Sequence, residues 1–140
     1  MPDARLQAIV DKSGVRPEMD EATSLKQLEP HGAAILKVVY DSIAERARGA
    51  GAKPVLIFLP QVREGSWQEE TPTTLRLATE AGFAVINLDS VYKGHDIDTV
   101  RLAEWDDHPN ALGHQIVADQ LFRAIAADPK LLFGPAQRQP

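Results

Sequence analysis

The ten residues from Trp105 to His114 hold the side chains of this chain that are best suited to acid–base chemistry. A carboxylate two residues before a His can fold back and accept the proton on the ring Nδ1, which leaves Nε2 free to take a proton from a nucleophile. Pro109 restricts His108 to extended backbone conformations, and Asn110 is a good N-cap for a helix that starts there. The block therefore predicts a general base, His108, held by an orienting acid.

Two acids precede His108, and the extended backbone separates them. Adjacent side chains of an extended chain point to opposite sides, so Asp106 shares the side of His108 and Asp107 points away. We therefore expect Asp106 to be the orienting acid, with its carboxylate roughly 2.6–3.2 Å from a ring nitrogen of His108. The alternative interpretation is a loop His beside an Asp that caps the last helix.

The other polar residues of the block are predicted to support the structure. Gly113 costs a helix about 1 kcal/mol relative to Ala, which favours close backbone packing at that position. His114 is expected to make a structural hydrogen bond. A metal site is not expected, because two His six residues apart do not share a helix face and Asp107 should point away from Asp106.

Apolar patterning predicts the elements that must position these residues. A continuous apolar run from Val55 to Leu59 is typical of a strand buried on both faces, as in a parallel sheet. Helices are expected where apolar residues recur every three to four positions, with Thr71 and Asn110 as caps. The predicted helices cover residues 3–12, 32–48, 72–81 and 110–127, the strands 55–59 and 83–88, and a connecting loop 13–30.

The alternation of helices and strands predicts an α/β fold in which the two strands are adjacent and parallel. A sheet of two strands is marginal on its own and leaves two open edges. We therefore expect the complete fold to contain more strands than this chain supplies.

The block from Trp105 to His114 also resembles the last conserved block of the GDSL/SGNH-type hydrolases, a superfamily of esterases and lipases. There an acid and a His precede a helix in an Asp-x-x-His-Pro-Asn-x-x-Gly-His pattern. The match is specific at His108-Pro109-Asn110 and Gly113-His114, and the order of elements over residues 31 to 127 agrees with the C-terminal half of that family. The resemblance implies a partial three-layer α/β/α fold (SGNH/flavodoxin-like), with a short parallel sheet flanked by helices.

Two departures from the family pattern change what the resemblance implies. Trp105 stands at the usual acid position, three residues before the His, which leaves Asp106 as the acid. The blocks that carry the Ser nucleophile and the oxyanion-stabilising Gly and Asn are absent, and an acid–base pair without a nucleophile cannot run acyl transfer. The resemblance therefore implies the C-terminal part of a serine ester hydrolase, inactive alone. In it Asp106 orients His108, and His108 activates a Ser outside this chain.

Local replacements for the missing nucleophile fit the pattern poorly. Ser90 follows a strand, but Leu88 stands where the family has Gly, and Asp89-Ser90 is expected to cap a turn. Ser66 lies in a loop with no strand before it, and Trp67 on the same loop is a candidate for substrate contact. The runner-up function is a non-catalytic binding or interaction domain that keeps the fold and the His-Pro-Asn corner for packing.

Composition sets the remaining expectations. Hydrophobic residues make up 44% and charged residues 25%, and the net charge is −5 without a run of Lys or Arg. A nucleic-acid partner is therefore not expected. No apolar stretch approaches the roughly 20 residues of a membrane span, and the first residues show no signal peptide, which leaves the compartment open.

The resemblance also implies the substrate, the partners and the domain organisation of the chain. It implies a small-molecule or carbohydrate ester as substrate, the missing N-terminal half or a partner chain, and no metal or organic cofactor. We expect an N-terminal helix and connecting loop over residues 1–30, the SGNH-hydrolase-like α/β half over 31–128, and a tail over 129–140.

Overall fold

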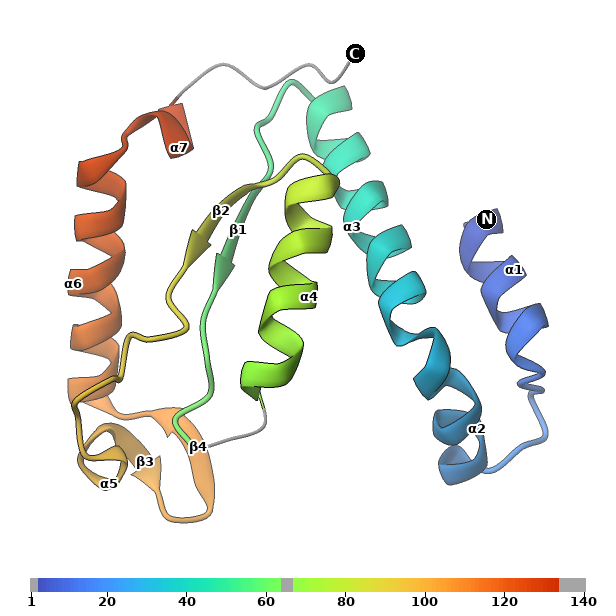
Figure 1. Cartoon of the computed structure of the whole chain (residues 1–140), viewed down its shortest axis with the longest axis horizontal. Coiled ribbons are helices and arrows are strands. Elements are labelled where there is room, and N and C mark those ends of the chain that lie inside the picture. Colours follow the sequence, from blue (N-terminus) through green and yellow to red (C-terminus); the bar gives the residue numbers. More distant parts are fainter. Residues whose placement is uncertain (1–2, 64–66, 134–140) are drawn as a thin grey trace.

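The computed structural model describes the backbone of residues 3–63 and 67–133, with side chains for residues 3–63 and 71–133. The protein is a mixed α/β chain that is mostly helical and has a short parallel pair of strands (Figure 1). Its helices are α1 (Ala4–Ser13), α2 (Glu21–Leu28), a 3-10 turn η1 (Glu29–His31), α3 (Gly32–Gly49), α4 (Trp67–Glu80), α5 (Ile97–Val100), α6 (Ala111–Ala127) and α7 (Lys130–Phe133), and its strands are β1 (Val55–Phe58), β2 (Ala84–Asn87), β3 (Arg101–Ala103) and β4 (Asp106–Pro109).

The two predicted strands pair as expected. β1 and β2 are parallel and in register from Val55 opposite Ala84 to Phe58 opposite Asn87, and α4 connects them. The expectation that β1 is buried on both faces is wrong, because the side chains of Ile57 and Leu59 are 47% and 43% exposed. β2 is the only strand that pairs with β1 in the described part of the chain, so the other edge of β1 is open.

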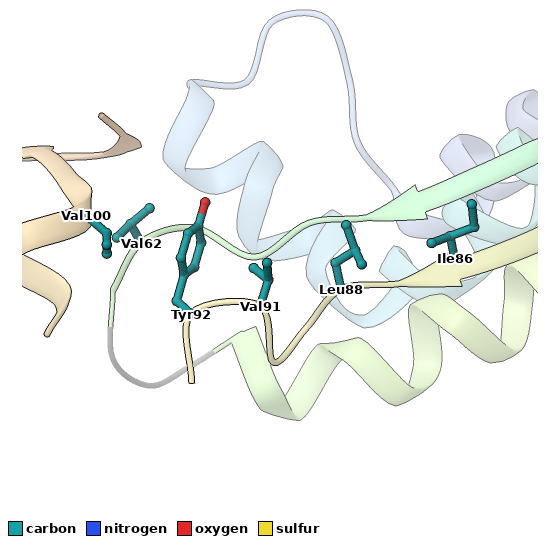
Figure 2. Close-up of a cluster of buried hydrophobic side chains, with 6 residues drawn as sticks. All are labelled: Val62, Ile86, Leu88, Val91, Tyr92 and Val100. Atoms are coloured by element: carbon teal, nitrogen blue, oxygen red, sulfur yellow. The ribbon is translucent and has the colours of Figure 1, made fainter. Parts of the chain in front are cut away.

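Helices lie on both sides of the strand pair. In Figure 1, α4 lies on one side of β1 and β2 and α6 on the other, while α3 packs against α4 and α1 packs against α3. A core cluster of six buried side chains continues from β2 into the segments after β1 and β2 (Figure 2). These are Val62, Ile86, Leu88, Val91, Tyr92 and Val100. The apolar face of α6 packs against this cluster through Ile116, Val117, Leu121, Ala124 and Ile125.

The N-terminal half contains one helix that the sequence pattern misses. Residues 21–28 of the expected connecting loop form α2, whose N-cap Asp20 accepts a hydrogen bond from the backbone N of Thr23 at 2.9 Å. Polar composition and two Pro residues favour a loop, but the Asp cap and the lack of Pro inside the segment allow a short helix.

The start of α4 is also earlier than predicted. The helix begins at Trp67, so Thr71 lies inside the helix rather than capping it, and Pro72 is an interior residue. An interior Pro removes one intrahelical hydrogen bond. Pro prefers the first helical turn, so the sequence predicted that the helix begins at Pro72, which is later than its observed start at Trp67.

Between β2 and α6, where the sequence predicts no strand, the chain contains a hairpin. β3 and β4 pair antiparallel, with Arg101 opposite Pro109, Ala103 opposite Asp106 and an irregularity between them. Strands of three and four residues are too short and too polar to show an alternating apolar pattern, which is why the sequence did not reveal them.

At the C-terminus, part of the predicted tail is folded. Residues 130–133 form α7, and its Leu131 packs against the core cluster. Residues 134–140 lie outside the described residues. Among the helices that the structure describes, none combines the length and the apolar character that crossing a membrane requires.

The first turn of α6 packs directly on the neighbouring backbone. Asn110 caps the helix as predicted, because its Oδ1 accepts a hydrogen bond from the backbone N of Gly113 at 3.0 Å. A Cβ atom at Gly113 would lie 2.5 Å from the backbone oxygen of Val100 and 2.8 Å from Cβ of Pro109. Gly is therefore required at this contact between α6, the end of α5 and the end of β4.

We expect Gly113→Ala to lower the free energy of unfolding by about 1–2 kcal/mol, since the cost of overpacking exceeds the gain in helix propensity. The matched control is Gly49→Ala, where a Cβ meets no described atom within 4 Å, and there we expect no loss. Urea unfolding of both variants measures the difference. Equal stability of the two variants would contradict the close contact.

Candidate functional site

Asp106 and His108 form a hydrogen-bonded pair on β4. Nδ1 of His108 lies 2.5 Å from Oδ1 of Asp106, slightly closer than the expected range, and the backbone N of His108 donates to the same oxygen at 3.0 Å. The side chain of Asp106 is 20% exposed and that of His108 is 84% exposed. The acid is thus held against the protein and the ring faces solvent.

The ionisation of Asp106 determines which ring nitrogen carries the proton. Two hydrogen bonds lower the pKa of the Asp106 carboxyl from its usual value. The larger effect comes from the His108 ring and the smaller from the His108 backbone N. An ionised carboxylate only accepts hydrogen bonds, so Nδ1 must be the donor. In the neutral ring the lone pair is then on Nε2, to which no described residue bonds, and this is the atom a general base uses.

Asp107 points away from the pair, as alternation along an extended strand requires. Its carboxylate lies 3.8 Å from the guanidinium of Arg63, and its backbone oxygen accepts a hydrogen bond from the backbone N of Val62 at 2.9 Å. Asp107 therefore ties β4 to the segment that follows β1, and Asp106 is the acid beside the ring.

Asn110 supports β4 from the far side of Pro109. Its Nδ2 donates to the backbone oxygens of Thr99 at 2.9 Å and Arg101 at 3.0 Å, and its backbone N donates to Val100 at 2.9 Å. His114 makes a different contact from the one predicted. Its ring is exposed, and the hydrogen bond that the described residues give it joins its backbone N to the oxygen of Asn110 at 2.8 Å.

The remaining predicted residues do not join the pair. The side chain of Trp67 and all of Ser66 lie outside the described residues. Ser90 lies in the turn after β2, and no hydrogen bond joins it to His108 among the described contacts. Trp105 lies beside the site, and the sequence pattern did not predict its exposure. Its side chain is 86% exposed between β3 and β4, and its position directly before the acid was the available signal.

A cavity of about 850 Å³ lies at the carboxyl ends of β1 and β2. It is lined by the segments that follow both strands and by the N-terminal half of α4. Open α/β sheets bind their ligands at this edge. His108 is not among the lining residues, but Arg63 is, and its contact with the Asp107 carboxylate connects the cavity wall to β4.

Within the described residues, no three His, Asp or Glu side chains come together in an arrangement that could hold a metal ion. Comparisons with known protein families, with curated proteins and with solved structures give no match to this chain. The chemistry of the site therefore has to be argued from its own residues.

We expect Asp106 to titrate below its ordinary pKa of about 3.9, because the bonds from His108 stabilise the carboxylate. A lowered pKa in the folded state stabilises the protein above the unfolded-state pKa, and this stabilisation is lost as the pH falls through the folded-state pKa. Carbon-detected NMR titration of the Asp106 carboxyl measures the midpoint, which should rise in His108→Ala. An unchanged midpoint in that variant would contradict the pairing.

Proposed function

We propose that this chain is the C-terminal part of an SGNH/GDSL-type serine ester hydrolase and supplies its acid–base pair. The contact of 2.5 Å between Asp106 Oδ1 and His108 Nδ1 carries the proposal, together with the exposure of the ring. A buried structural His would direct both nitrogens to protein groups. Here Nδ1 is held by an acid and the side chain is exposed, so Nε2 remains available to a nucleophile.

In this mechanism the two residues have separate roles. Asp106 holds the ring in one tautomer and stabilises the imidazolium that forms when Nε2 takes a proton. His108 removes the proton from a Ser hydroxyl and later returns a proton to the leaving alcohol of the small-molecule or carbohydrate ester. The Ser and the oxyanion donors come from the missing N-terminal half or from a partner chain.

The strand pair is consistent with part of a larger parallel sheet in a three-layer α/β/α fold. Helices flank β1 and β2 on both sides (Figure 1), and the outer edge of β1 is open among the described residues. The side chains of Ile57 and Leu59 are also half exposed near that edge, where burial against a further strand and helix would stabilise them. We propose that the segment carrying the nucleophile adds to this edge.

An activity assay on the whole chain tests the proposal. Alone, it should show no labelling by a fluorophosphonate probe and no hydrolysis of a p-nitrophenyl ester, because the nucleophile and oxyanion donors act as a unit with the base. Adding the segment encoded upstream, if it carries a Gly-Asp-Ser block, should produce both. In the completed enzyme Asp106→Asn should lower kcat about 10⁴-fold, and Asp107→Asn is the matched control.

Two outcomes would overturn the proposal. Labelling of the isolated chain that disappears in both His108→Ala and Ser90→Ala would identify Ser90 as the nucleophile. No labelling when the upstream segment is supplied, or no upstream Gly-Asp-Ser block at all, would favour the non-catalytic binding domain.

A further inference from the structure

The cavity at the carboxyl ends of β1 and β2 has an apolar interior. Leu75 of α4 and Ile97 of α5 line it and are both partly buried, and Tyr92, which also lines it, is 6% exposed. Its volume of about 850 Å³ is within the range of small-molecule sites. An apolar body of a ligand would fit against these three side chains.

Positive charge predominates among the described side chains that line the cavity. The cations Arg63 and Lys93 line it beside the imidazole of His95, and Asp89 is the single carboxylate among them. Arg63 is shared with Asp107, whereas Lys93 and His95 are exposed and no described carboxylate bonds to either. These two side chains lie on one turn between β2 and α5, so they can contact the same anionic group.

Tyr92 adds a polar group without a partner. Its hydroxyl is buried and has no hydrogen-bond partner among the described residues. In Figure 2 its ring stands between Val62 and Val91. A buried polar group without a partner is rare and costs stability, and Tyr92 is itself one of the residues that line the cavity.

We propose that this cavity binds a small organic anion, with an apolar body against Leu75 and Ile97 and its carboxylate or phosphate oxygens at Lys93 and His95. A charge-assisted hydrogen bond from Lys93 and a hydrogen bond from the His95 ring would hold the anionic end, and the apolar lining would contact the rest of the ligand. His108 does not line the cavity. The proposed binding therefore does not depend on the ester hydrolase proposal, and either can fail alone.

An NMR titration of the ¹⁵N-labelled whole chain tests the proposal, with 4-phenylbutyrate, phenyl phosphate and the neutral 4-phenylbutanamide as probes. We expect saturable shifts of the amide signals of residues 92–97 with at least one of the two anions, and much weaker binding of the amide. Comparison of the two anions tells whether carboxylate or phosphate is preferred. Lys93→Met should raise Kd roughly fivefold to tenfold.

The matched control is Lys26→Met, which removes an exposed Lys on α2 and should leave Kd unchanged. Leu75→Ala should weaken binding of either anion by reducing the apolar contact. Equal binding of amide and anion, an equal effect of the two Lys variants, or no saturable shifts at residues 92–97 would each overturn the proposal.

Discussion

The side-chain amide of Asn110 determines the geometry of the whole C-terminal part. Its Oδ1 caps α6 by accepting from Gly113, and its Nδ2 donates to the oxygens of Thr99 and Arg101. One side chain therefore joins the end of α5, the start of β3 and the first turn of α6. These contacts bring α6 so close that only Gly fits at position 113. β4, which lies between β3 and α6, has its course fixed by the same contacts.

The acid–base pair follows from this constraint. β4 runs extended into Pro109, so Asp106 and His108 point to one side and Asp107 to the other. One carboxylate oxygen of Asp106 accepts both the ring and the backbone N–H of His108. Asp107 meanwhile connects β4 to the segment after β1. The ring of His108, which is 84% exposed, therefore keeps its orientation through the Asp106 carboxylate, while Asp107 fixes the strand that carries both residues.

The sequence predicted the elements that carry a strong apolar pattern of their own. β1 follows a continuous apolar run, α3 and α6 have clear apolar periodicity, and the side of β4 that carries Asp106 follows from alternation. The signals failed where a contact distant in sequence decides. β3 and β4 are too short to show a pattern and depend on pairing with each other and on Asn110. The exposure of Ile57 and the cavity beside Lys93 depend on which elements cover β1 and which segments follow the strands, and no local pattern encodes that.

We expect Asp106 to hold His108 with its proton on Nδ1 and its lone pair on Nε2. A long-range ¹H–¹⁵N correlation of the His rings at alkaline pH measures it directly, because it distinguishes the two neutral tautomers. We predict that His108 is the Nδ1–H tautomer, that Asp106→Ala shifts it toward the Nε2–H tautomer, and that Asp107→Ala leaves it unchanged. The other three His of the chain serve as internal comparison. An Nε2–H tautomer in the unaltered protein, or a tautomer that does not respond to Asp106→Ala, would contradict the account.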